Sequence, residues 1–274
     1  MPGRTTWRHC AIPGRIWQNA RMNRLSLFIS LFGLALAAGC ASTPETRVVA
    51  ADSAECVVLM HGLNRSWRAM EPLAAKLQQA GYSTVNVDYP SQLGTIEELA
   101  PVAVGMGVDA CRETGARTIH FVTHSMGGIL LRYQHEHSPI EDIGRVVMLG
   151  PPNQGSELVD QTREWPGIDA VNGPAGAQLG TNPDSMPSRL GPVSFPLGVI
   201  AGTATINVLA SAMLPDEDDG KVTVERTRVE GMTDFLIVDD SHRYMLRSRT
   251  VLENTVAFLR SGHFLEKSPA PDIS

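Results

Sequence analysis

The sequence has no apolar run of the roughly 18 residues that cross a bilayer, and it has no excess of basic residues. Its 23 Lys and Arg face 29 Asp and Glu, which gives a net charge of −6. Residues 1–39 hold five Arg and no acid, so the remaining residues carry 18 basic side chains (23 less 5) against 29 acidic ones. A nucleic-acid partner requires a basic surface, so we expect none. Gly and Pro, 25 and 18 of 274 residues, are too few for a collagen-like or low-complexity chain.

The first 39 residues have the layout of an export signal. Arg21 and Arg24 precede the short apolar segment 25–38, and small residues follow it, as in secretory signals. Ala37-Ala38-Gly39-Cys40 resembles a bacterial lipobox, although Ala37 stands where Leu is commoner. That resemblance implies a diacylglycerol on Cys40, and so an exported protein anchored to a bacterial membrane, on the periplasmic side.

Other interpretations of this region stay open. The segment could be a plain signal peptide cut near Ala41, or a buried apolar helix. Met22 offers an alternative start, which would leave residues 1–21 untranslated. Residues 40–54 are polar and aperiodic and predict a tether, the main domain is expected over 55–265, and a flexible tail is expected over 266–274.

Two cysteines, Cys56 and Cys111, remain in the predicted domain. An exported protein meets an oxidising compartment, which permits a disulfide between them. Cys56 opens a predicted strand, and Cys111 ends a predicted helix that leads into the neighbouring strand, so both would lie at the same end of the sheet. Two buried free thiols are the alternative.

Short apolar strands alternate with amphipathic helices along the domain. Strands are predicted at 57–60, 84–87, 119–122, 146–149, 197–201 and 235–238, and helices at 67–80, 96–110, 126–136 and 251–259. This alternation predicts an α/β fold with a parallel sheet covered by helices on both faces. Residues 150–195, rich in Gly, Pro, Asn and Ser, break the pattern and predict a cap or lid.

The most informative motif is the predicted strand-to-helix turn at Ser125, within Phe121-Val122-Thr123-His124-Ser125-Met126-Gly127-Gly128. Such a turn places the Ser in a strained backbone at the carboxyl edge of the sheet and needs small residues two places to either side. Gly127 meets this need, whereas Thr123 replaces the usual Gly. An ordinary Ser N-cap is the alternative.

A second motif, His61-Gly62-Leu63, follows the first predicted strand. An oxyanion formed in acyl transfer needs two preorganised N–H donors, one after the nucleophile and one in this loop. Met126 and Leu63 are therefore the expected donors, with Asn64 the neighbour to consider. We expect His61 to hold the loop by hydrogen bonds.

The candidate base is His242, because it follows the last predicted strand and His exchanges protons near neutral pH. The remaining histidines of the domain are interpreted as structural or surface residues: His120, His124, His135, His137 and His263. The candidate orienting acid is Asp219, with Asp218 as the alternative. Asp239 and Asp240 lie too close to His242 in sequence to be preferred. The spacing of a calcium loop is not met, so no metal site or cofactor is expected.

Together these motifs resemble the bacterial lipase/esterase-type α/β-hydrolases, the group with triacylglycerol lipases and GPI inositol-deacylase-like proteins. The resemblance spans residues 55–260 and includes Pro151-Pro152-Asn153-Gln154-Gly155-Ser156 at the start of the cap. It implies a Ser125-Asp219-His242 triad, with the amides of Leu63 and Met126 as the oxyanion hole. The two leading antiparallel strands of larger members are expected to be absent, which leaves about six parallel strands.

The function predicted from these residues is hydrolysis of carboxylic esters, with lipid-like or acyl esters favoured because of the expected anchor. Three alternatives stay open: acyl transfer to an acceptor other than water, thioesterase or amidase activity, and a non-catalytic envelope-binding lipoprotein. No protein partner is evident.

Overall fold

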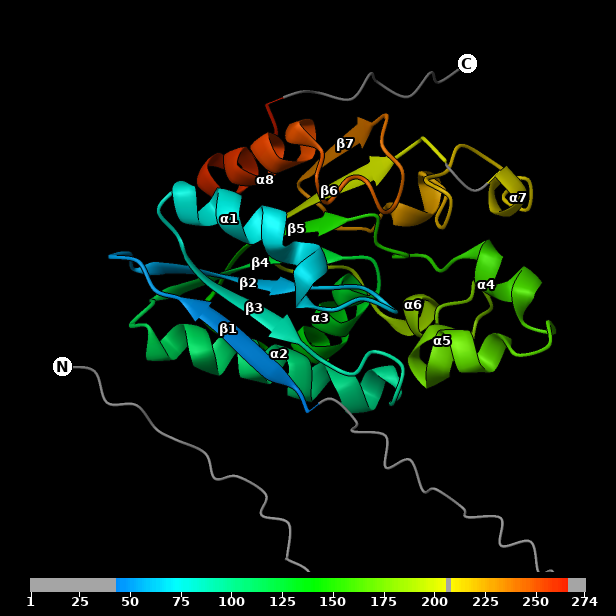
Figure 1. Cartoon of the computed structure of the whole chain (residues 1–274), viewed down its shortest axis with the longest axis horizontal. Helices are drawn as coiled ribbons and strands as arrows, with labels where there is room; N and C mark the ends of the chain where they lie inside the picture. Colours follow the sequence, from blue (N-terminus) through cyan, green and yellow to red (C-terminus); the bar gives the residue numbers. More distant parts are fainter. Residues whose placement is uncertain (1–42, 206–207, 266–274) are drawn as a thin grey trace, which may run out of the picture. The chain divides into compact units, whose positions relative to one another are not determined.

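A seven-stranded sheet organises the residues that the computed structural model describes, 43–205 and 208–265 (Figure 1). The strand order is β1-β3-β2-β4-β5-β6-β7. The strands are β1 (Glu45–Val49), β2 (Glu55–Met60), β3 (Ser83–Asp88), β4 (Thr118–His124), β5 (Ile143–Leu149), β6 (Leu197–Gly202) and β7 (Asp234–Val238). The expected signal peptide, Cys40 and the tail 266–274 lie outside the described residues.

Strands β2 to β7 are mutually parallel, which confirms the prediction of about six parallel strands. The tether predicted over 40–54 is wrong at Glu45–Val49, because β1 pairs antiparallel with β3 along the edge of the sheet. The predicted absence of the two leading antiparallel strands of larger members is wrong for one of them, because β1 is such a strand. Four of the five β1 residues are exposed, so this strand carries no buried apolar pattern that a sequence could reveal.

Helices cover both faces of the sheet (Figure 1). On one face lie α2 (Ile96–Glu113) and α3 (Met126–His137), and on the other lie α1 (Glu71–Gln79) and α8 (Arg249–Ser261). A short 3₁₀ helix (Trp67–Met70) leads into α1, and α2 starts at a capping box formed by Thr95 and Glu98. The central strands are buried on both sides because each face packs against its own apolar cluster.

The disulfide candidates meet at the amino-terminal edge of the sheet. The structure joins Cys56, in β2, to Cys111, near the end of α2, with their Cα atoms 5.7 Å apart. Parallel strands all present their carboxyl ends at the opposite edge, so this bond lies away from the turn at Ser125.

The segment predicted as a cap contains α4 (Glu157–Thr162), α5 (Ile168–Ala177) and α6 (Met186–Arg189). Arg132, on α3, hydrogen-bonds to both ends of this segment. Its guanidinium donates to the carbonyl groups of Asn153 at the start and of Leu190 and Gly191 at the end. Two further short elements, α7 (Val208–Ser211) and a 3₁₀ helix (Glu225–Thr227), follow β6. In the part of the chain that the structure describes, no helix is long and apolar enough to span a bilayer.

Candidate active site

Ser125 lies at the turn between β4 and α3 in a strained backbone. Its φ of 52° and ψ of −125° fall in a region that non-glycine residues rarely adopt. Its N–H donates to the Leu149 carbonyl of β5 at 2.9 Å, and its carbonyl accepts from Gly128 at 3.0 Å. The sheet and the helix together hold the strained conformation, so the structure places Ser125 in the kind of turn that its motif predicts.

The turn is crowded enough to require particular glycines. A Cβ on Gly127 would lie 2.9 Å from the carbonyl oxygens of Met60 and His61. A Cβ on Gly62 would lie 2.9 Å from the Ser125 Cβ. Thr123, which replaces the usual Gly, is fully buried, and a Cβ on Gly128 would lie only 3.2 Å from its Oγ1. Because Gly128 has no side chain, it leaves room for the Thr123 side chain.

Two amide groups beside Ser125 have no hydrogen-bond partner among the described residues. Met126 is the first residue of α3, where a backbone N–H has no partner within its own helix. Leu63 follows Gly62, which packs against Ser125. Among the described residues, neither amide donates a hydrogen bond. Unpaired donors at a helix start suit a developing negative charge.

The loop that carries Leu63 is anchored through Asn64. Asn64 has a φ of 57°, in the left-handed region that Asn tolerates better than most residues. Its N–H donates to Ser91 Oγ at 3.1 Å, and its side-chain amide donates to the Val171 carbonyl in α5 at 2.7 Å. Asn64 therefore links the loop to the cap. Its place after His61-Gly62-Leu63 in the sequence does not predict this role.

His242 and Asp219 form a buried pair at the carboxyl edge of the sheet. His242 Nδ1 lies 2.6 Å from Asp219 Oδ2, and the His242 N–H donates to the Asp219 carbonyl at 2.9 Å. The other carboxylate oxygen of Asp219 accepts the N–H groups of Lys221 and Val222 at 3.0 and 2.9 Å. With Nδ1 donating to the carboxylate, Nε2 carries the lone pair that a general base needs.

Asp218 faces a different set of partners. Its carboxylate accepts from the Gly220 N–H and from Ser211 Oγ, both at 2.6 Å, and has no contact with His242 in the described structure. The geometry therefore favours Asp219 over Asp218 as the partner of His242. Gly150 makes room for this pair, since a Cβ there would lie 2.9 Å from both Asp219 Oδ2 and His242 Nδ1. The sequence signal that could have indicated this role is that Gly150 directly follows the predicted strand 146–149.

His61 and His124 support the surrounding loops. The ring of His61 is fully buried and stacks on Tyr89, with 4.1 Å between centroids; its Nδ1 lies 2.8 Å from the Gly62 carbonyl. His124 Nε2 lies 2.9 Å from the His242 carbonyl, so its N–H donates there and steadies the loop of the candidate base. Burial, and then the neighbouring His242, hold the pKa of His124 well below its ordinary value.

Ser125 and His242 line one cavity of about 560 Å³ between the sheet edge and the cap. The cap side of this cavity is apolar and includes Leu158, Val159, Trp165 and Ile168. No group of three or more His, Cys, Asp or Glu that could hold a metal occurs within residues 43–205 and 208–265. The site thus combines a strained Ser, a His–Asp pair and two unpaired amides beside a cavity that accepts apolar groups.

Comparisons with known proteins agree with this architecture. The model of the alpha/beta hydrolase family matches residues 57–271. A lipase from Bacillus licheniformis, BlEst2 in its propeptide form, has a TM-score of 0.63 and 19% identity over 82% of this chain; the match spans about half, 55%, of that longer chain.

The matches to two further structures span nearly the whole length of those chains. The metagenome-derived lipolytic enzymes LipS and LipT give a TM-score of 0.60 at 18% identity, over 79% of this chain and 97% of theirs. A monoacylglycerol lipase from Paleococcus ferrophilus gives 0.52 at 18% identity, over 81% and 100%. At these identities the structures show a shared fold. No curated protein sequence matches this chain.

Proposed function

Since the chain belongs to the alpha/beta hydrolase family, we propose that it is a serine hydrolase that cleaves carboxylic esters through a covalent acyl-enzyme. The observation that carries the proposal is the buried Asp219–His242 pair, whose His242 lines the same cavity as the strained Ser125. Structural likeness to lipases and esterases supports ester hydrolysis in general terms.

The proposed mechanism assigns one role to each group. Ser125 Oγ attacks the ester carbonyl while His242 Nε2 takes its proton, and Asp219 stabilises the imidazolium that forms. The N–H groups of Leu63 and Met126 bind the oxyanion. His242 then returns the proton to the departing alcohol, and a water molecule activated by the same His releases the acid and restores the Ser.

The apolar side of the cavity favours an acyl chain as the group it binds. Burial of methylene groups stabilises such a complex by up to about 0.8 kcal/mol for each CH₂. We therefore propose acyl esters as the substrates, with chain length limited by the cavity of about 560 Å³.

Hydrolysis of p-nitrophenyl esters from acetate to palmitate by the full-length protein tests the proposal. Ser125→Ala is expected to lose more than about 10³-fold in kcat, because the nucleophile is removed, with an unchanged thermal unfolding midpoint. Retained turnover in the purified variant would rule out Ser125 as the nucleophile. Absence of turnover by the folded wild-type protein with every ester would point instead to acyl transfer, another substrate or a binding role.

Export and lipid anchoring at Cys40 form a second part of the proposal. The basic and apolar pattern of residues 21–40 supports it, as does the Cys56–Cys111 disulfide, since such bonds persist in oxidising compartments. Mass spectrometry of the mature amino terminus tests it: a diacylglyceryl group on Cys40 is expected, and an unmodified mature chain starting elsewhere would contradict it.

A further inference from the structure

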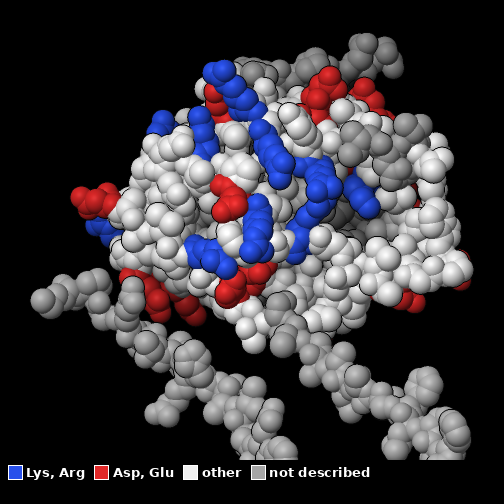
Figure 2. Space-filling view, in the orientation of Figure 1, with Lys and Arg blue, Asp and Glu red and all other residues white. Residues whose placement is uncertain are grey.

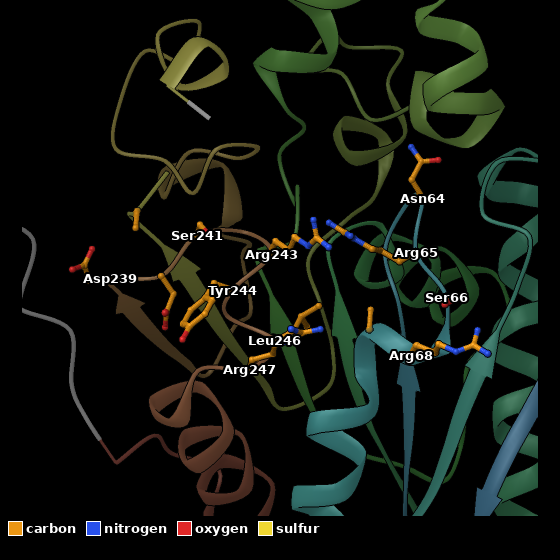
Figure 3. A pocket seen from close by; sticks show the side chains of 13 residues that line it. Asn64, Arg65, Ser66, Arg68, Asp239, Ser241, Arg243, Tyr244, Leu246 and Arg247 are labelled. Atoms are coloured by element: carbon orange, nitrogen blue, oxygen red, sulfur yellow. The ribbon is translucent and has the colours of Figure 1, made fainter. Parts of the chain in front are cut away.

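A second cavity, of about 620 Å³, lies directly beside the candidate active site. Most of its lining residues come from the loop after β2 with the 3₁₀ helix that follows, and from the loop after β7, which also carries His242; Ala204, after β6, is the exception (Figure 3). Asn64 and Arg65 line both cavities. The two cavities therefore adjoin, with Ser241 and Arg243 placing the second one next to His242.

Four arginines line this cavity although the protein as a whole is acidic: Arg65, Arg68, Arg243 and Arg247. Within residues 43–205 and 208–265, none of their guanidinium groups forms an ion pair or a hydrogen bond with the protein. In the view of Figure 2, Lys and Arg side chains gather across the middle of the molecular surface, around a hollow. Surface arginines that lack acidic partners are available to an anionic ligand.

Arg65 and Arg243 extend toward each other across the cavity (Figure 3). Burial, and then the neighbouring Arg243, lower the pKa of the half-buried Arg65 from its usual value, although an arginine so shifted stays cationic at neutral pH. Asp239 and Asp240 also line the cavity, but neither forms an ion pair with an arginine among the described residues. Two like charges held close together without a counterion favour binding of an anion between them.

We propose that this cavity binds a phosphate group on the alcohol part of the ester substrate, so that the enzyme acts on acyl esters of phosphorylated alcohols. This inference rests on the proposed function. The acyl chain occupies the apolar cavity below the cap, and the carbonyl lies at Ser125. His242 must reach the departing alcohol oxygen, and the arginines lie just beyond His242, so the anionic group belongs to the alcohol.

The reaction leaves the phosphate intact. Ser125 Oγ bonds to the acyl carbon, the bond from that carbon to the alcohol oxygen breaks, and the Ser125 proton passes through His242 to the alcohol. Water then adds to the same carbon, the bond to Ser125 Oγ breaks, and His242 returns a proton to Ser125. The products are a carboxylic acid and the phosphorylated alcohol, and no bond to phosphorus forms or breaks.

A pair of substrates that differ only in the phosphate tests the proposal. We compare hexanoylglycerol phosphate with hexanoylglycerol and measure kcat/KM for both with the full-length protein at low ionic strength. The wild-type protein is expected to prefer the phosphate ester. In Arg65→Gln/Arg243→Gln the ratio of the two values is expected to fall on the order of ten-fold or more, because bonds to charged groups are lost.

Arg117→Gln is the matched control, because Arg117 is exposed and precedes β4 at the opposite edge of the sheet. It removes one positive charge of the same kind and is expected to leave the ratio unchanged. A ratio unaltered in the double variant, or lowered equally in the control, would overturn the proposal.

Binding to Ser125→Ala separates this proposal from the proposed function. Calorimetry is expected to show that hexanoylglycerol phosphate binds this variant more tightly than either hexanoylglycerol or inorganic phosphate. Arg65→Gln/Arg243→Gln in the same background is expected to abolish the preference over hexanoylglycerol. This result supports the arginine site even if no ester is hydrolysed. Equal affinity for inorganic phosphate and the phosphate ester would overturn its assignment to a substrate.

Discussion

At the scale of single residues, the candidate site depends on how the backbone is held around Ser125 and His242. Gly62 and Gly150 matter through the side chains they lack, since a Cβ on either would lie 2.9 Å from a residue of the proposed triad. Contacts this short leave no space for Ala without displacing the neighbouring groups. The arrangement is therefore set by small residues in three loops as much as by the reactive ones.

Asn substitutions distinguish the two neighbouring acids. In Asp219→Asn the carboxylate that accepts the His242 N–H and stabilises its charge is lost, so kcat is expected to fall by about 10²- to 10⁴-fold. Asp218→Asn keeps a side-chain oxygen that accepts from the Gly220 N–H, and its NH2 can donate to Ser211 Oγ, so we expect a change of less than about three-fold. Steady-state kinetics on one p-nitrophenyl ester measure both. The opposite result would move the role to Asp218.

Much of this residue-level arrangement was predictable because its signals are local. Ser125, Met126 and Gly127 adjoin in sequence, and His61-Gly62-Leu63 directly follows a strand. The arginine cavity was not predictable, since Arg65 and Arg243 come from loops far apart in the sequence, and an Arg in a loop has no distinctive pattern. A sequence shows charges one at a time, whereas the fold decides which of them remain without partners.

The buried His124 predicts that stability falls in mild acid. Because burial holds its folded pKa well below the unfolded value of about 6.5, the unfolded chain gains a proton below that pH that the folded protein cannot take up. Stability present above pH 6.5 is thus lost as the pH falls toward the folded pKa, by up to about 1.4 kcal/mol per pH unit.

Urea unfolding between pH 7.5 and 5 measures this effect, the wild-type protein being compared with His124→Asn. The variant is expected to lose less free energy of unfolding over that range, because one titrating group is gone. His120 and His135, whose pKa values burial also lowers, account for part of the remaining slope. Parallel curves for the two proteins would show that His124 does not contribute.

At the scale of elements, Arg132 connects α3 to both ends of the cap segment. Its guanidinium is buried, and burial lowers its pKa to about 10. Four hydrogen bonds join it to Asn153, Leu190 and Gly191. Because α3 begins directly after Ser125, the same helix positions the proposed nucleophile and holds the cap above it.

Arg132→Met is expected to loosen the cap. Loss of the guanidinium leaves buried carbonyl groups without donors, which costs about 3 kcal/mol or more in the free energy of unfolding. Hydrogen exchange is expected to rise first in residues 153–191. The matched control is Arg163→Met, whose side chain is half exposed and, within the described part of the chain, pairs with Asp160 alone at 3.8 Å, so its change is expected to stay below about 1 kcal/mol. Equal protection of the cap in both variants would contradict this role.

The edge strand β1 shows where element prediction from sequence reaches its limit. The buried strands are recognisable as apolar runs because both of their faces are covered. Among the described strands, Glu45–Val49 pairs with β3 alone and exposes most of its side chains, and Arg47 lies over the Trp67 ring at 3.8 Å. Its stability therefore comes from backbone pairing and a cation–π contact, neither of which leaves a periodic pattern.

At the scale of the whole molecule, the disulfide and the proposed catalytic residues lie at opposite edges of one sheet. The Cys56–Cys111 bond closes a loop with a sequence separation of 55 residues at the amino-terminal edge, while Ser125, Asp219 and His242 lie at the carboxyl edge. A cross-link of this length restricts the unfolded chain, and chain-entropy reasoning gives about 4 kcal/mol as its largest contribution.

Removing the bond should therefore lower stability without changing catalysis. In Cys56→Ala/Cys111→Ala we expect the free energy of unfolding to fall by about 2–4 kcal/mol, with kcat on a p-nitrophenyl ester unchanged below the unfolding transition. A reductant should shift urea unfolding of the wild-type protein toward that of the variant, and should leave the variant itself unaffected. Iodoacetamide labelling of both Cys56 and Cys111 in the unreduced, unfolded wild-type protein would show that the bond does not form. A parallel loss of kcat would show instead that strain at one edge of the sheet reaches the other.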